Sequence, residues 1–199
     1  MSATFTVDFF STLDGYGMSE GWPGYWGKEG PELIEDRVRT FAQDQVLVFG
    51  ATTFREFRSF VRDYDEPYYD SLNELPKLVF SRTLEEPLGW QNSRVLREDA
   101  VTAIERLKQT TDVPMRSHGS ISLNRALLAA GLVDRLEVMV FPVVGGRAGG
   151  SALLHGGAEL DLELIESTVL DGRTQKLVYA PRVHGEIPAG VGPKLRNAS

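Results

Sequence analysis

The stretch that decides the fold runs from Val113 to Gly146 and reads VPMRSHGSISLNRALLAAGLVDRLEVMVFPVVGG. Its first residues, Val113 to Ser117, can form a strand, and a turn of small residues, His118-Gly119-Ser120, follows. Leucines then recur at helical spacing as far as Gly131, where a helix should end. The apolar run from Val133 to Phe141 is typical of a second, buried strand. This order of strand, glycine turn, helix and strand predicts a βαβ unit of a parallel sheet.

The turn inside this unit has two interpretations. The backbone N–H groups around Gly119 to Ile121 lie at a predicted helix N-terminus, where the helix dipole and unpaired donors favour an anion such as a phosphate. Alternatively, Gly119 only reverses the direction of the chain. Both interpretations fit the sequence equally well.

Composition limits the class of protein. The chain has 199 residues, of which 42% are hydrophobic and 25% charged, as expected for one globular domain. A net charge of -7 and the lack of a stripe of basic and aromatic residues argue against a nucleic-acid partner. The absence of cysteine excludes disulfides and thiolate chemistry, and no histidine has a carboxylate at metal-ligand spacing, so we expect no metal.

The sequence predicts neither a signal peptide nor a membrane span. Strand-like sequence begins by Phe5 without a signal peptide, and no apolar run approaches the roughly 20 residues of a membrane span. We therefore expect a cytoplasmic protein with no membrane partner. Residues 1–184 are predicted to form one domain, and the Pro-, Gly- and Ala-rich residues 185–199 a disordered tail.

The remaining segments alternate between strands and helices. Predicted strands are Thr4–Ser11, Gln45–Gly50, Pro76–Ser81, Ser93–Leu96, Leu160–Leu170 and Thr174–Ala180. Predicted helices are Pro31–Gln43, a segment over Phe54 to Phe60 that Thr52 or Thr53 can cap, and Asp99–Gln109. Asp171-Gly172 is a hairpin signal between the last two strands, and the acidic, tyrosine-rich segment Asp63–Glu74 is expected at the surface.

The loop from Met18 to Gly30 is unusually aromatic. It contains Trp22, Tyr25 and Trp26 together with four glycines. Large apolar side chains in a loop need a surface to pack on, and a lid over a flat ligand would make Trp22 and Trp26 substrate-binding residues. Packing onto the core of this domain, or onto a partner subunit, is the alternative.

Short motifs in the right order and spacing resemble the dihydrofolate-reductase-like superfamily over about residues 4 to 181. Within it, the chain is most similar to the branch of the reductase domain of the bifunctional riboflavin-biosynthesis protein. The resemblance implies a three-layer α/β sandwich with a mainly parallel central sheet that ends in an antiparallel hairpin. The motifs are Ser11-Thr12-Leu13-Asp14-Gly15, Gly50-Ala51-Thr52-Thr53-Phe54, Lys77-Leu78-Val79-Phe80-Ser81-Arg82-Thr83, Gly131-Leu132-Val133-Asp134-Arg135-Leu136 and Phe141-Pro142-Val143-Val144-Gly145-Gly146.

The same resemblance implies a reductase that passes hydride from NADPH to a small heterocyclic substrate, such as a pterin or a pyrimidine. Ser81 and Arg82 would hold the 2′-phosphate, because a guanidinium can chelate phosphate oxygens; Arg82 as an ordinary surface arginine is the alternative. Ser120 stands where the family usually has a second glycine. The residues implied around the pyrophosphate are Gly50, Thr52, Thr53, His118, Gly119, Ser120 and Ile121.

Candidates for the chemical step are acidic residues. Asp14 matches an aspartate that faces the substrate in the riboflavin branch, and a turn-forming Asp-Gly explains it equally well. Glu32 and Glu35 fall on the helix that carries the substrate carboxylate in folate reductases, but neither has the Trp-x-x-Pro-x-Asp context of those enzymes. At least one of the two is expected to be a surface charge.

The sequence leaves open whether the chain is a reductase or only a binding module, and which segment forms a dimer interface. The zinc-binding deaminase half of the riboflavin protein is missing, so the chain resembles a stand-alone reductase domain. A module that binds a nucleotide or small molecule without catalysis is the alternative, and the test is whether Asp14 and the aromatic loop line one cleft. Because related proteins commonly form dimers, we also expect a homodimer, with the Gly-rich segment Pro142–Gly157 as a candidate interface.

Overall fold

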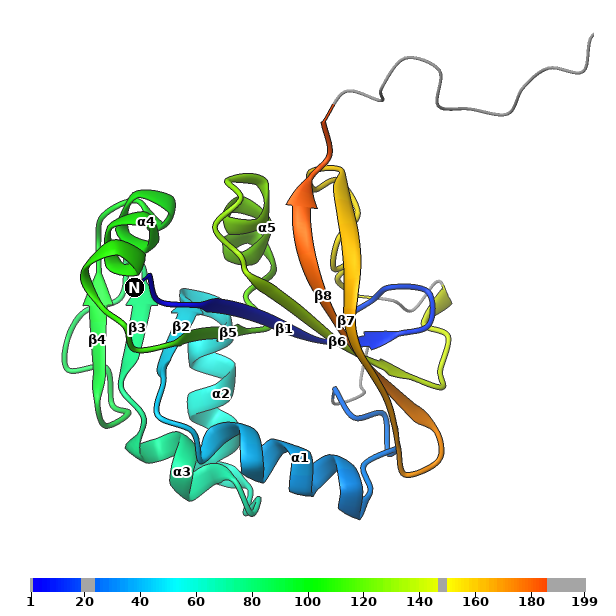
Figure 1. The fold of residues 1–199 in the computed structure, drawn as a ribbon. Helices are drawn as coiled ribbons and strands as arrows, with labels where there is room; N and C mark the ends of the chain where they lie inside the picture. Colours follow the sequence, from blue (N-terminus) through cyan, green and yellow to red (C-terminus); the bar gives the residue numbers. More distant parts are fainter. Residues whose placement is uncertain (1, 19–23, 147–149, 186–199) are drawn as a thin grey trace, which may run out of the picture.

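Eight strands form one sheet in the order β4-β3-β2-β5-β1-β6-β8-β7 in the computed structural model, which describes residues 2–18, 24–146 and 150–185 (Figure 1). The six strands from β4 to β6 are mutually parallel, and β8 and β7 close one edge as an antiparallel hairpin. Helices cover both faces of the sheet, which confirms the predicted three-layer architecture. No helix in these described ranges is long and apolar enough to cross a membrane.

The predicted elements are present, with small shifts at their ends. The strands are β1 (Phe5–Thr12), β2 (Val46–Gly50), β3 (Lys77–Phe80), β4 (Ser93–Leu96), β5 (Met115–His118), β6 (Arg135–Phe141), β7 (Leu160–Leu170) and β8 (Thr174–Val183). The helices are α1 (Pro31–Phe41), α2 (Ala51–Asp63), α3 (Tyr69–Glu74), α4 (Ala100–Thr110) and α5 (Ile121–Ala129). The predicted tail lies outside the described residues except for Gly185.

Two local predictions were wrong. The segment Asp63–Glu74 is not simply surface, because it contains α3 and buries Tyr68 and Leu72 against the core. Thr52 and Thr53 do not cap α2, because Gly50 occupies the N-cap position and both threonines already lie in the first helical turn. The acidic segment therefore forms a short helix, and its apolar side chains are buried although its charges had indicated a surface position.

The two faces of the sheet differ, and β1 shows this most clearly. Phe5, Val7 and Phe9 point to the side that α5 covers and pack with its leucines in one apolar core. Asp8, between them in sequence, points to the side that α1 covers. Full burial of each large apolar side chain stabilises the fold by about 1.5–3 kcal/mol, so the α5 side supplies much of the core energy.

Helix α1 is positioned by the tip of the β7–β8 hairpin. Pro31 stands at its start, but the cap comes from Asp171, whose Oδ1 and Oδ2 accept from the backbone N–H groups of Glu32 (2.9 Å) and Leu33 (3.1 Å). A Cβ at Gly30 would overlap the Asp171 carboxylate, so glycine is required there. The hairpin turn therefore fixes where α1 begins over the sheet.

Candidate active site

The predicted cofactor residues gather at one edge of the sheet, where β2, β3 and β5 end. Gly50 is in register with Phe80, so Ser81 and Arg82 follow directly beyond the end of β3. The next strand on the other side of β2 is β5, which ends at His118. Parallel strands bring these segments together although they are far apart in the sequence.

Two reciprocal hydrogen bonds join the loops that precede α2 and α5. The backbone N–H of Gly50 donates to Ser120 Oγ (3.0 Å), and the backbone N–H of Ser120 donates to Thr53 Oγ1 (3.1 Å). Gly119 has a φ of +68°, and a Cβ there would lie 3.2 Å from the Thr53 methyl group. Glycine is therefore needed at 119 both for the turn and for the close approach.

Both helices begin without a side-chain cap at this junction. Ser120 is left-handed (φ 36°, ψ 52°), and its hydroxyl occupies the Gly50 donor that the resemblance implied for a phosphate. In the described part of the chain, no side chain bonds the backbone N–H of Thr52 or Ile121. The first turns of α2 and α5 therefore remain suited to an anion, and they fit a dinucleotide pyrophosphate.

The loop after β3 presents Arg82 to solvent. The Ser81 hydroxyl accepts from the backbone N–H groups of Thr83 (3.2 Å) and Leu84 (3.0 Å) and so shapes the turn. The Arg82 carbonyl accepts from Arg97 Nη1 (3.0 Å), while the Arg82 side chain is exposed. This geometry is compatible with a phosphate contact and with an ordinary surface arginine.

His118 points from the end of β5 to the α1 side of the sheet. Its Nδ1 contacts Asp8 Oδ1, and the rings of Phe10 and Phe57 lie edge-on to the imidazole at 4.7 and 5.2 Å. Burial lowers the pKa of His118 to about 4, so the ring is neutral at pH 7. His118, which directly precedes the predicted phosphate turn Gly119-Ser120, thus also contacts a buried polar network through Asp8.

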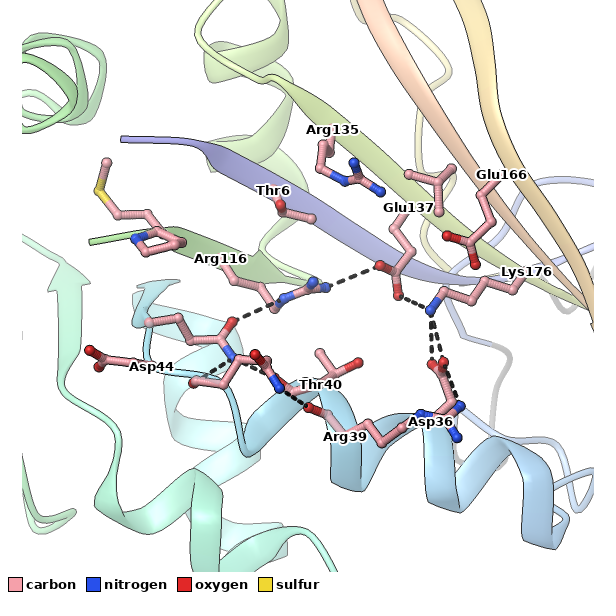
Figure 2. A pocket seen from close by; sticks show the side chains of 15 residues that line it. Thr6, Asp36, Arg39, Thr40, Asp44, Arg116, Arg135, Glu137, Glu166 and Lys176 are labelled. Carbon is pink, nitrogen blue, oxygen red and sulfur yellow. Dashed lines mark hydrogen bonds and ion pairs between the residues drawn. The ribbon is translucent and has the colours of Figure 1, made fainter. Parts of the chain in front are cut away.

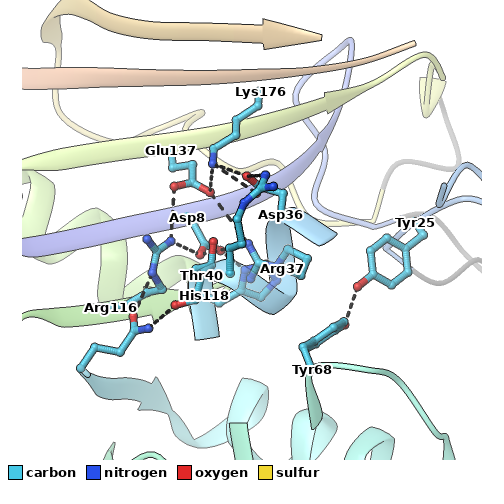
Figure 3. A network of polar contacts seen from close by, with 12 residues as sticks. Asp8, Tyr25, Asp36, Arg37, Thr40, Tyr68, Arg116, His118, Glu137 and Lys176 are labelled. Atoms are coloured by element: carbon cyan, nitrogen blue, oxygen red, sulfur yellow. Dashed lines mark hydrogen bonds and ion pairs between the residues drawn. The ribbon is translucent and has the colours of Figure 1, made fainter. Parts of the chain in front are cut away.

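That network, which we call the buried charge layer, consists of Asp8, Asp36, Arg37, Arg116, Glu137 and Lys176 and lies between α1 and the sheet (Figure 3). Arg116 Nη1 lies 2.6 Å from Asp8 Oδ2 and 3.4 Å from Glu137 Oε2. Lys176 Nζ lies 2.9 Å from Asp36 Oδ1. Three cations thus face three anions, and their mutual attraction offsets the desolvation cost of burying charge.

The sequence motifs did not predict the buried charge layer. Its signal was nevertheless present, because Asp8 is the only charged residue of the predicted strand Thr4–Ser11, and Glu137 stands between Leu136 and Val138 in the predicted buried strand. A lone carboxylate in such a run needs a cationic partner from elsewhere in the fold. The sequence did not say which cation that would be.

Asp14 has a structural role, which argues against a proton donor. Its Oδ1 accepts from Thr12 Oγ1 (2.7 Å) and from the backbone N–H of Gly145 (2.8 Å), and its Oδ2 accepts from that of Gly146 (2.8 Å). These hydrogen bonds lower the pKa of Asp14 to about 2, so it is ionised at neutral pH. Asp14 fastens the loop after β1 to the loop after β6, as the turn interpretation expected.

Asp14 and the described end of the aromatic loop, residues 24–30, do not line one cleft. Asp14 borders a cavity of about 340 Å³ whose wall includes Phe9 and Val138, on the α5 side of the sheet. Trp26 is only 4% exposed and packs with Leu33 and Phe141 under α1, on the other side. Trp26 is therefore a core residue, which corrects its prediction as a lid over a substrate, and Trp22 lies outside the described residues.

Glu32 is also committed to the fold. Its Oε2 accepts from the backbone N–H of Asp171 at the hairpin tip, so the carboxylate faces that turn. Glu32 lies in the exposed first turn of α1, and Glu35 pairs with Arg39 one turn further on. Neither glutamate reaches the buried charge layer, and the proposed catalytic role of Glu32 has no support in this geometry.

Tyr25 joins the described end of the aromatic loop to the body of the domain. Its hydroxyl shares a hydrogen bond with that of Tyr68, next to α3, and its ring packs on Phe10 at 5.1 Å. Phe10 in turn contacts His118. Phe10 of β1 and Phe57 of α2 thus contact the imidazole, and Tyr25 of the loop packs on Phe10.

A separate groove of about 460 Å³ opens on the α1 side near the starts of β5 and β6 (Figure 2). Arg116, Glu137 and Lys176 of the buried charge layer reach it, together with the more exposed Arg39 and Arg135. None of the predicted site residues that the structure describes lines this groove, which lies toward the opposite strand ends from Gly50 and Gly119. Among the described residues, no group of three or more potential ligands could hold a metal ion.

The parallel sheet, the closing hairpin and the joined helix N-termini define an α/β protein of the dihydrofolate-reductase-like type. The chain belongs to the RibD C-terminal domain family, whose model matches residues 3–176. This is the reductase-type family that the sequence motifs had indicated. No curated protein matches the chain.

Solved structures agree on the fold. A protein from Shewanella sp. PV-4 assigned to riboflavin biosynthesis is 23% identical, with a TM-score of 0.72 over 92% of this chain and 99% of its own. A pyrimidine reductase-like protein from Corynebacterium diphtheriae is 12% identical, with a TM-score of 0.60 over 92% and 93%. The deaminase/5-amino-6-(5-phosphoribosylamino)uracil reductase of Thermotoga maritima is 14% identical, with a TM-score of 0.65 over 91% of this chain but 57% of its own.

Proposed function

We propose that this protein is an NADPH-dependent reductase that transfers hydride to a small pyrimidine-type ring. The observation that carries the proposal is the junction of two uncapped helix N-termini at the end of β2 and β5, directly beside His118. Family membership and the pyrimidine-linked names of two of the similar structures support the substrate class. The cysteine-free sequence also fits a reducing, cytoplasmic setting.

In this proposal, the first turns of α2 and α5 hold the pyrophosphate through their backbone N–H groups. Arg82, exposed just past β3, contacts the 2′-phosphate that distinguishes NADPH from NADH. When bound, the dihydronicotinamide supplies the hydride. The half-buried rings of Phe10, Tyr25 and Phe57 offer apolar faces for a flat heterocycle.

The alternative is a module that binds a nucleotide without reducing anything. It gains support from Asp14, which is ionised and fully committed to hydrogen bonds, and from Glu32, which is bound to the hairpin turn. A reductase would then need another group, or a held water, to supply the proton. The two functions share the nucleotide site and differ only in turnover.

A nucleotide titration tests the proposal. The three tryptophans provide a fluorescence signal for NADPH and NADH binding. Arg82→Ala should weaken NADPH by roughly 10- to 100-fold, as expected for the loss of a charge-assisted contact, and leave NADH almost unchanged. Arg182→Ala, on the exposed part of β8, is the matched control and should change neither.

Turnover then separates the two functions. Oxidation of NADPH in the presence of an aminouracil would support the reductase, and tight NADPH binding without oxidation by any pyrimidine would favour the binding module. Failure to bind either dinucleotide would reject both.

We further propose that the protein works as a homodimer through the β7–β8 hairpin. β7 is an edge strand, and Leu162, Leu164 and Val169 are 43%, 54% and 57% exposed. Leu162 and Leu164 lie opposite Pro181 and Tyr179 in β8, which together make an apolar face. We therefore propose the hairpin as the interface, in place of the Gly-rich segment Pro142–Gly157.

Sedimentation velocity tests the dimer. Wild-type protein should sediment as a dimer, and Leu164→Glu should shift it to a monomer, because a buried charge opposes association. Thr168→Glu introduces the same charge on the other face of β7 and should leave the dimer intact. A wild-type monomer at micromolar concentration would reject this proposal.

A further inference from the structure

Asp8 determines which nitrogen of His118 carries the hydrogen. Arg116 Nη1 lies 2.6 Å from Asp8 Oδ2, and Arg37 Nη1 lies 3.5 Å from the same oxygen, so the carboxylate is held in its ionised form. An ionised carboxylate can only accept hydrogen bonds. Since Asp8 Oδ1 contacts His118 Nδ1, that nitrogen must be the donor.

The second nitrogen of the ring, Nε2, is then a free acceptor. Burial favours the neutral imidazole, and in a neutral ring with hydrogen on Nδ1 the lone pair lies on Nε2. Charged groups reach this region from β1 (Asp8), α1 (Arg37), β5 (Arg116) and β6 (Glu137), and they bond one another. Within residues 2–18, 24–146 and 150–185, no group donates to Nε2.

The position of the ring makes this acceptor relevant to a ligand. The His118 side chain is 12% exposed, and its Nδ1 edge is turned to Asp8 inside the network (Figure 3). Phe10 and Phe57 flank the ring, and the next residues in the chain, Gly119 and Ser120, belong to the phosphate turn. The imidazole therefore stands between the aromatic cluster and the proposed pyrophosphate site.

We infer that His118 Nε2 accepts a hydrogen bond from a ring N–H of the substrate, and that Asp8 is the positioning residue that fixes this tautomer. The inference rests on the proposed function, because it assumes that the heterocycle binds in the aromatic cluster around His118. It narrows the substrate class to heterocycles that carry an N–H donor, as uracil-type rings do. N-alkylated analogues are excluded, since they would leave the acceptor unpaired.

Nitrogen-15 NMR tests the tautomer without any ligand or activity. The chain has only three histidines, so His118→Asn assigns the side-chain signals by loss of one set. We expect a protonated Nδ1 and a bare Nε2 for His118, unchanged between pH 5 and 8. Asp8→Asn should convert the ring to the Nε2–H tautomer, because the amide can donate to Nδ1. A bare Nδ1 in the wild-type protein, or titration near pH 6.5, would overturn the inference.

The same nitrogen-15 resonances test whether His118 Nε2 binds a ring N–H of the substrate. We expect uracil to shift the Nε2 resonance and 1,3-dimethyluracil to leave it in place, and His118→Gln to weaken uracil at least tenfold. The titrations are made with and without NADP⁺, whose binding is followed by tryptophan fluorescence. Loss of dinucleotide binding while uracil still shifts Nε2 would reject the proposed function and keep this inference. An unmoved Nε2 resonance, with or without bound dinucleotide, would overturn the inference alone.

Discussion

The two sides of the sheet hold their helices by different physics. On one side, α5 packs its leucines on Phe5, Val7 and Phe9 in an apolar core. On the other side, α1 packs through apolar residues such as Leu33 and also through the buried charge layer, where Asp8 and Glu137 are 2% and 4% exposed. An apolar interface of the same size would be no weaker, because burying ions costs desolvation energy that pairing only offsets.

The two sides of the sheet therefore have different roles. The apolar side tolerates changes of shape and supplies stability, whereas the charged side requires each partner to be present and sets the orientation of His118. Adjacent residues in β6 allow a direct comparison, because Leu136 faces the α5 side and Glu137 faces the α1 side.

The largest expected effect comes from this pair of neighbours. Leu136→Ala should cost about 2–5 kcal/mol of unfolding free energy through its cavity. Glu137→Gln should cost about 3–5 kcal/mol, because it leaves three buried cations with two anions. Leu136→Met, which keeps volume, should cost less than about 1.5 kcal/mol. Urea denaturation followed by tryptophan fluorescence measures all three variants. If Glu137→Gln costs no more unfolding free energy than Leu136→Met, the charged side does not need each of its partners.

Acid should weaken the charged side through His118. Its pKa is lowered from 6.5 to about 4 in the folded protein, so between these values the unfolded chain binds the extra proton. Stability is therefore present above pH 6.5 and lost as the pH falls toward 4, by up to roughly 3 kcal/mol. Urea denaturation at a series of pH values should show a smaller loss in His118→Asn. The exposed His184→Asn should keep the wild-type slope, and equal slopes in all three proteins would contradict the assignment.

A smaller effect is expected where the hairpin holds α1. Asp171→Ala removes the cap on the backbone N–H groups of Glu32 and Leu33 and should cost about 0.5–2 kcal/mol. Asp171→Asn should cost less, since asparagine still offers an oxygen and tolerates the φ of +52° at this position. Thermal unfolding by circular dichroism distinguishes the two. Equal losses would mean that the cap contributes nothing.

The smallest effect on stability is expected at Ser120, in the turn before α5. Ser120→Gly loses the bond to the Gly50 N–H but relieves a left-handed serine, and the two contributions of about 1 kcal/mol each should nearly cancel. Ser120→Ala loses the bond and keeps the strain, so it should be less stable than Ser120→Gly by about 1 kcal/mol. Urea denaturation of the two variants tests this order. A more stable alanine variant would show that the backbone at 120 is unstrained.

The sequence predicted the fold well because its signals are local. Periodicity in residues 113–146 gave β5, α5 and β6, and Asp171-Gly172 gave the hairpin. The turns before α2 and α5 lie at one sheet edge, as predicted, because parallel strands share their carboxyl ends. The acidic candidates were less successful, since Asp14 and Glu32 are bound by Gly145, Gly146 and Asp171, which are distant in the chain.

What the sequence alone determined is therefore the order of the elements and their approximate bounds, because both depend on neighbours within a few positions. Tertiary structure alone decided the partners: Asp8 with His118, 110 residues away, and Asp171 with Glu32, 139 residues away. Such pairs depend on strand register and on where α1 lies over the sheet, and no local pattern encodes either. Charge and hydrogen-bonding groups in a sequence show that partners are needed, and only the packed fold shows which partners they find.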